Sequence, residues 1–144
     1  MAAQENIRIV RDYMQAVRDR DERRMGDILA DHAVVRVAGV PRALGGVVQG
    51  REQILQNFRQ QPPPQGEADT RTIFADDTHV CAVQRVSASF DGSEHFKGTG
   101  KPYTTYQAAV YTLAGGRIEE QTLYINFLDV YVQAGVIGLD SLRA

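Results

Sequence analysis

The sequence predicts one α+β domain over residues 1–144, in which three helices come first and a run of antiparallel strands follows. Apolar residues recur with helical spacing in the N-terminal part of the chain. The later segments instead alternate or are β-branched, and short turns separate them. Because only one strand is expected among the helices, this order favours α+β over a parallel α/β sheet.

Three helical patterns open the chain. The first covers residues 5–20, and its apolar stripe includes Tyr13, which we therefore expect to point inward. Asp21 can cap a second helix, since its carboxylate can accept from a free backbone N–H group of the first turn. Gly50 opens a third helix, and the triple proline at 62–64 ends it because proline lacks the backbone donor.

Five strands and a last helix complete the predicted order. A β-branched segment, Ala33–Val37, predicts the first strand, and a turn-rich connection at 39–46 follows it. A short helix from about Phe127 to Gln133 closes the chain, with Gly135 at its C-cap. The other four strands are expected at Thr70–Ala75, Val80–Phe90, Tyr103–Leu113 and Arg117–Asn126.

Charge and cysteine content exclude several classes of function. The 16 basic and 18 acidic residues nearly balance, and along Arg18–Arg24 they interleave instead of forming the basic stripe of a nucleic-acid-binding protein. Cys81 is the only cysteine, which excludes an intrachain disulfide and a thiolate metal cluster. The N-terminus lacks a signal-peptide pattern and no apolar run is long enough to cross a bilayer. We therefore expect a cytoplasmic protein that has neither nucleic acid nor membrane as a partner.

Three stretches of the chain carry a family resemblance. They are Leu29–Val35 (LADHAVV), Phe96–Pro102 (FKGTGKP), and the final hairpin Gly116–Glu120 followed by Tyr124–Asn126. In this order they resemble the SnoaL-like family of the nuclear transport factor 2-like superfamily, over nearly the whole chain. The resemblance implies a cone-shaped, curved antiparallel sheet with the three N-terminal helices packed on its concave face. It also implies a deep pocket for a small hydrophobic molecule, a homodimer through the outer sheet face, and no obligatory cofactor.

Asn126 stands where the resemblance leads us to expect a catalytic acid. In SnoaL-like cyclases and limonene epoxide hydrolases, the matching position at the end of the last strand is commonly an aspartate. An amide does not exchange protons near neutral pH, so Asn126 would orient a carbonyl or hydroxyl group of the substrate. The alternative role, which is compatible with the first, is to cap the terminal helix together with Asp129.

Alternation along the last strand groups other polar side chains with Asn126. Glu120, Thr122 and Tyr124 share its face, so they line the pocket if Asn126 does. Tyr124 is otherwise a large core side chain with a satisfied hydroxyl. On the preceding strand Gln107 is a candidate for substrate binding, since a half-buried strand rarely holds an amide without a partner. The alternative for Gln107 is a face turned to solvent or to a second copy.

Three further candidates come from the resemblance. Tyr13 matches the oxyanion-binding tyrosine of ketosteroid isomerases, although core packing would also explain it. Arg85 begins the Arg-x-Asp motif of epoxide hydrolases of this fold, but Ser87 replaces its aspartate; Arg85 would stabilise an enolate or else point outward. His32 stands where the family has a second acid, and it is either a general base suited to neutral pH or a surface residue. His79 and His95 are expected to be exposed, and we predict no metal site.

We therefore expect a cofactor-independent enzyme that cyclises, isomerises or dehydrates a polyketide-, steroid- or terpenoid-like substrate by stabilising an enolate or alkoxide. One alternative is a non-catalytic binding or accessory protein of the same fold, which the two missing carboxylates favour. A second alternative is a divergent enzyme of the limonene epoxide hydrolase type. The candidate hydrogen-bond donors are Tyr13, Gln107, Tyr124 and Asn126, and the candidate bases are His32, Glu120, Asp129 and the substrate itself.

Overall fold

The structure, a computed structural model, describes residues 2–40, 45–61, 66–93 and 96–143. These residues form six strands, four α-helices and a short 3-10 helix at 139–142. The helices are α1 (Ala2–Asp19), α2 (Glu22–Ile28), α3 (Arg51–Gln60) and α4 (Phe127–Gln133). The strands are β1 (Leu29–Ala38), β2 (Val47–Gln49), β3 (Gly66–Ala75), β4 (His79–Ser89), β5 (Pro102–Ala114) and β6 (Arg117–Ile125).

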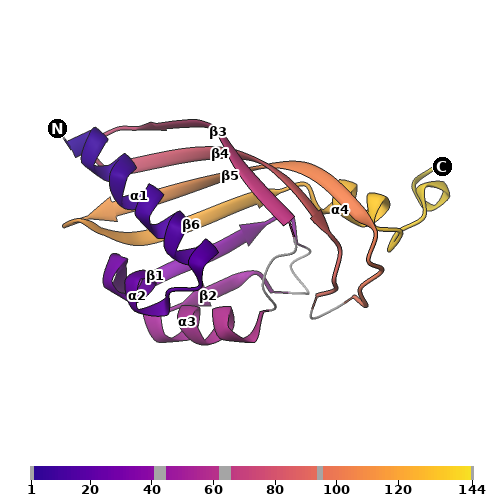
Figure 1. The fold of residues 1–144 in the computed structure, drawn as a ribbon, viewed down its shortest axis with the longest axis horizontal. Helices are drawn as coiled ribbons and strands as arrows, with labels where there is room; N and C mark the ends of the chain where they lie inside the picture. The colour runs from indigo at the N-terminus through magenta and orange to yellow at the C-terminus, as the bar shows by residue number, and fades with distance from the viewer. Residues whose placement is uncertain (1, 41–44, 62–65, 94–95, 144) are drawn as a thin grey trace.

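All six strands belong to one curved, open sheet in the order β2-β1-β6-β5-β4-β3 (Figure 1). Helix α1 crosses one face of this sheet, while α2 and α3 pack near β1 and β2 (Figure 1). This arrangement confirms the predicted α+β class. The sheet departs from a fully antiparallel one at a single pair, since β1 and β6 run parallel. The chain leaves β1 through β2 and α3, and it returns to β1 only with the last strand of the meander.

The described helices and strands confirm the predicted elements. Helix α4 has both of its predicted ends, and the residue after its C-cap, Gly135, adopts a φ of 76°. Strand β2 was not predicted, because three residues are too few to show an alternating pattern. The triple proline, part of the turn at 39–46, and His95 lie outside the described residues. None of the described helices is long and apolar enough to span a membrane.

Helix α1 turns its apolar stripe toward the sheet, because residues three and four apart lie on one side of a helix. Val10, Tyr13 and Met14 are buried there, and Tyr13 points inward as predicted. Asp21 caps α2 as predicted, since its carboxylate accepts from the Arg24 backbone N–H at 3.1 Å. We call the sheet face that packs against α1 the inner face and the opposite one the outer face.

A β-bulge in β6 decides which of its side chains reach the inner face. Opposite β5, Leu113 pairs with Ile118 but Thr112 pairs with Glu120, so Glu119 is an extra residue. One extra residue reverses the alternation from that point on. Ile118 is fully buried among the core residues, whereas Glu120, two positions later, lies on the outer face. Beyond the bulge the inner residues are therefore the odd-numbered ones, from Gln121 to Ile125.

Helix α4 is attached beside the point where β6 ends. Its Val130 and Ala134 form a second small core with Phe90. The Gln133 side chain accepts from the Thr104 backbone N–H and donates to the Thr104 carbonyl, both at 2.9 Å. The β6 strand has ended at this point, so the side-chain amide of Gln133 satisfies the Thr104 backbone groups on the edge of β5 that a further β6 residue would otherwise bind.

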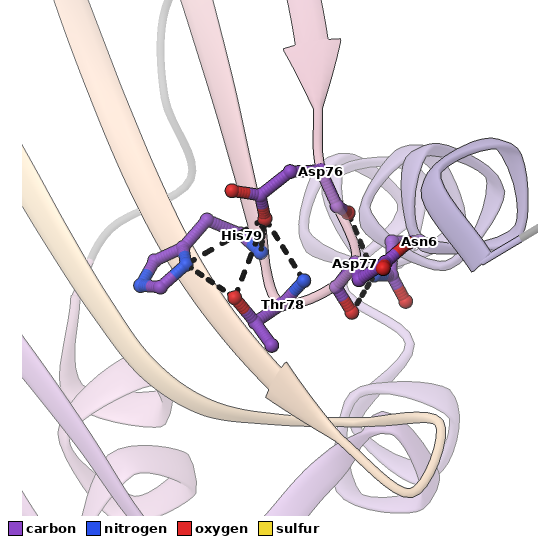
Figure 2. A network of polar contacts seen from close by, with 5 residues as sticks. All are labelled: Asn6, Asp76, Asp77, Thr78 and His79. Carbon is purple, nitrogen blue, oxygen red and sulfur yellow. Dashed lines mark hydrogen bonds and ion pairs between the residues drawn. The ribbon is translucent and has the colours of Figure 1, made fainter.

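The N-terminal half of α1 is anchored on the β3–β4 turn (Figure 2). The buried amide of Asn6 donates to the carbonyl oxygens of Asp76 and Asp77, at 3.3 and 3.0 Å. Within the turn, the Asp76 carboxylate accepts from the backbone N–H groups of Thr78 and His79, at 2.9 and 2.7 Å (Figure 2). These bonds favour the charged form and hold the pKa of Asp76 below its ordinary value.

We predict that acidification removes the contribution of this turn to stability. Above pH 3.8 the ionised Asp76 is favoured by the fold, and as the pH falls below 3.8 the unfolded chain takes up the proton first. The stability advantage of the wild type over Asp76→Asn should therefore shrink as the pH falls from 6 to 3 in urea unfolding. Asp77→Asn is the control, because the Asp77 carboxylate makes no hydrogen bond within the described chain. An advantage that stays constant with pH would contradict the prediction.

Candidate functional site

Polar side chains from three neighbouring strands meet on the inner face. Directly opposite residues in antiparallel strands point to the same side, so the pairs Thr70–Gln84 and Gln84–Gln107 bring these three residues into one row. The Gln107 Nε2 donates to the Gln84 Oε1 at 3.0 Å. The Gln84 Nε2 donates to the Thr70 hydroxyl oxygen at 3.3 Å and to the Met14 sulfur at 3.6 Å. We call Thr70, Gln84 and Gln107 the amide relay.

Two tyrosines, one from α1 and one from β5, pack together at the inner face beyond Ala109. The Tyr13 and Tyr111 rings are 6.3 Å apart and cross at 74°, an edge-to-face contact between α1 and β5. The Gln121 side chain donates to the Tyr111 hydroxyl oxygen at 3.5 Å. Burial raises the pKa of Tyr13 to about 12, and it also raises the pKa of Tyr111. Both phenols are therefore protonated near neutral pH, and each has a hydrogen that it can donate.

The inner face beyond α1 combines these neutral polar groups with apolar ones. On β3 to β6, every polar side chain at a described inner position is an amide or a hydroxyl. Gln84 is only 8% exposed, but Gln107 is half-buried and keeps accessible surface. The apolar inner residues opposite or diagonal to Gln107 on the adjacent strands are also half-buried; they are Val86, Leu123 and Ile125. The arrangement can bind a molecule by apolar contact and by hydrogen bonds to uncharged groups.

The predicted residues of β6 share a face, but the bulge turns that face away from α1. Glu120, Thr122 and Tyr124 all point outward, contrary to the expectation that they line the inner pocket. Glu120 makes an ion pair with Arg36 at 3.2 Å, and Tyr124 is 51% exposed. The error has a physical cause, since alternation counted from the buried Ile118 would have placed all three inside.

Asn126 takes the capping role that the sequence left open. Its side chain accepts from the Asp129 backbone N–H at 3.1 Å at the start of α4. Together with Tyr124 it borders an open depression of about 330 Å³. The other residues of this depression are Ala38, Gly39 and Ile125. A second open depression, of about 340 Å³, lies between β2 and α3 and carries the side chains of Gln49, Gln53, Gln56, Asn57 and Gln60.

The remaining candidates lie on the surface. Arg85 is exposed on the outer face of β4, and Ser87, also outer, contacts the Thr104 hydroxyl at 3.1 Å. The His32 side chain is 73% exposed, and its Nε2 lies 3.5 Å from a Glu119 carboxylate oxygen. No three His, Cys, Asp or Glu side chains in the described part of the chain are grouped so that they could hold a metal ion.

Of the predicted site residues, the structure therefore brings Tyr13 and Gln107 to one face and leaves the others elsewhere. Sequence reasoning missed Gln84 and identified its neighbour Arg85 as a candidate instead. A signal was present, since Val80, Ala82 and Gln84 alternate along β4 and the first two are fully buried or nearly so. Alternation along β5 also places Tyr111 on the face of Gln107.

We predict that Tyr13 makes the fold sensitive to alkali. The pKa of Tyr13 rises from 10 in the unfolded chain to about 12 in the folded one, so the fold favours the protonated phenol. The contribution of this preference to the free energy of unfolding is fully present below pH 10 and is lost as the pH rises through 12. Over that range the free energy of unfolding of the wild type should fall by on the order of 2–3 kcal/mol more than that of Tyr13→Phe, which has no phenol to titrate. Urea unfolding at several pH values measures this difference. Parallel alkaline profiles of the two proteins would refute it.

The comparisons with known proteins agree with this architecture. The solved structures that match include an LEH-like epoxide hydrolase of M. tuberculosis, at 19% identity and a TM-score of 0.73 over 99% of this chain and 97% of the other. A protein proposed to be a SnoaL-like polyketide cyclase from Jannaschia sp. CCS1 matches at 16% identity and a TM-score of 0.76, with 94% of both chains covered. An NTF2-like protein from Burkholderia xenovorans LB400 matches at 18% identity and a TM-score of 0.73, over 92% and 97%.

At these identities the solved structures show the fold alone. Among curated protein sequences, none matches the chain at significant similarity. The family model of the SnoaL-like domain matches residues 10–121, which include the C-terminal half of α1, the amide relay and most of the sheet. The chain therefore belongs to the SnoaL-like domain family.

Proposed function

We propose that this protein binds a small, largely apolar molecule of polyketide-, steroid- or terpenoid-like character on the inner face beyond α1. The observation that carries the proposal is the amide relay, which presents the half-buried Gln107 at the edge of an apolar surface. Small-molecule sites typically combine a mostly apolar lining with a few fixed polar groups. Gln107 is fixed in this way, because Gln84 and, through it, Thr70 and Met14 hold its amide.

The groups of the inner face suit binding without charge. Burying an ion requires a partner charge or extensive hydrogen bonding, whereas an amide needs only hydrogen-bond partners. The inner positions of β3 to β6 supply amides and hydroxyls, so they match an uncharged ligand. Apolar contact with Val86, Leu123 and Ile125 would provide most of the affinity, and Gln107 would orient the ligand.

A second candidate function is catalysis of cyclisation, isomerisation or dehydration, and Tyr13 favours it. A buried phenol that remains protonated can donate to the oxygen of a developing enolate or alkoxide. His32, Glu120 and Asp129 lie away from the inner face, so the proton acceptor in this candidate is a group of the substrate itself. Absorbance of the conjugated product would reveal isomerisation of a β,γ-unsaturated ketone, and an unchanged spectrum would leave this candidate without support.

We predict that filling the inner face abolishes binding. Val86 lies two residues from Gln84 on the inner side of β4, so Val86→Phe should occupy the ligand space. The affinity for 2-naphthol, an apolar aromatic alcohol, should fall by at least about tenfold, since a steric block removes the apolar contact area. Tyr124→Ala is the matched control on the outer face and should bind like the wild type.

Fluorescence titration measures both affinities, because the chain has no tryptophan to overlap with naphthol emission. Loss of binding in Tyr124→Ala, with normal binding in Val86→Phe, would move the site to the depression beside Asn126. Failure of the wild type to bind would count against the proposed function itself.

We also propose that two copies pair through the outer face, as the family resemblance implies. Phe74, Tyr106 and Tyr124 on this face are 58%, 61% and 51% exposed, and such aromatic side chains are enriched in protein interfaces. Tyr106 lies opposite Arg85, so an added arginine would place like charges together in each copy.

We therefore predict that Tyr106→Arg converts a dimer into a monomer, because burying unpaired like charges at an interface is unfavourable. Leu139→Arg is the control, since Leu139 is similarly exposed (54%) but lies in the C-terminal 3-10 helix. Size-exclusion chromatography with light scattering reports the masses. A monomeric wild type, or a Tyr106→Arg variant that stays dimeric, would argue against this interface.

A further inference from the structure

The amide relay has a direction, and Met14 sets it. A thioether sulfur accepts hydrogen bonds but has no hydrogen to donate. The Gln84 side chain must therefore turn its nitrogen toward Met14, at 3.6 Å, and its oxygen toward β5. The reverse orientation would place the Gln84 oxygen against the sulfur, where two acceptors would face each other.

The orientation of the Gln84 amide also fixes the orientation of the Gln107 amide. Because the Gln84 oxygen faces β5, Gln107 must turn its nitrogen toward it, and the two atoms are 3.0 Å apart. The Gln107 oxygen then points away from the relay. Within the described residues no group donates to this oxygen, although the rest of the side chain is held in place. Gln107 thus presents a fixed acceptor to the half-buried surface around it.

We propose that this site selects ligands that carry a hydrogen-bond donor, namely apolar alcohols or phenols, over ketones, ethers and carboxylates. The proposal rests on the proposed binding function and specifies its ligand class. A hydroxyl group donates to the Gln107 oxygen and completes its hydrogen bonding. A carbonyl, ether or carboxylate oxygen placed against the Gln107 oxygen would meet another acceptor, which disfavours binding.

The surroundings of Gln107 support this ligand class. Its direct neighbour on β6 is Ile125, and its neighbours along the inner side of β5 are Thr105 and Ala109. Thr105 is 6% exposed and Ala109 is 5% exposed, so the accessible surface around Gln107 is mainly aliphatic. A ligand with one hydroxyl group on an otherwise apolar frame matches one acceptor within an apolar surface.

Binding of 2-naphthol and 2-methoxynaphthalene to the intact chain tests the proposal. The two probes share one frame, and methylation removes only the donor. The wild type should bind 2-naphthol about five- to tenfold more tightly, the ratio expected for one hydrogen bond to a fixed acceptor. Gln107→Leu should abolish this preference while keeping an apolar surface. Met14→Leu conserves the volume but removes the sulfur, so it should reduce the preference because the relay can then reverse.

The outcomes separate the inference from the function on which it rests. If both probes bind the wild type equally, or the ether binds more tightly, the ligand class is wrong and the binding function stands. If neither probe binds, the binding function fails and the inference fails with it. A preference that survives in Gln107→Leu also overturns the inference, since the acceptor would then lie elsewhere. Circular dichroism verifies the fold of each variant, and the ¹³C shift of the Gln107 side-chain carbonyl reports the contact directly in the wild type.

Discussion

The single extra residue at Glu119 controls the chemical character of the inner face. Without this bulge, the alternation that buries Ile118 would continue through Glu120, Thr122 and Tyr124. A carboxylate would then lie on the inner face and would require a charged partner there. The bulge instead sends Glu120 to the outer face, where it pairs with Arg36. The inner face of β6 is left with an amide and aliphatic groups, so the site on it is uncharged.

The register of three strands then assembles the polar part of the site. Thr70, Gln84 and Gln107 are far apart in sequence, yet each lies directly opposite the next across the sheet. A second bulge, which leaves Arg71 without a partner on β4, shifts β3 by one residue and so brings Thr70 opposite Gln84. Neutral hydrogen bonds satisfy the polar groups of this row, so its burial requires no ion pair.

The helices and strands could be predicted from the sequence more completely than the candidate site. Helical periodicity and capping residues such as Asp21 act locally, so they are visible in the sequence and the structure confirms them. The inward position of Tyr13 follows from the same periodicity. A bulge has no such local pattern, because the extra residue is defined by the partner strand. For that reason the sequence could not decide which residues of β6 lie on the inner face. Gln84 was missed although its own strand alternates regularly.

The position of α1 connects the distant β3–β4 turn to the site. Asn6 fixes the helix by two hydrogen bonds to that turn, and Met14 follows eight residues later, about 12 Å along the axis. At that position along the helix the Met14 sulfur accepts a hydrogen bond from Gln84 and so orients the amide relay. A shift of α1 by one turn, about 5 Å, would remove the sulfur and with it the reason for the relay to point in one direction. The hydrogen-bonding preference that we propose for the site therefore depends on helix placement rather than on an ionisable group.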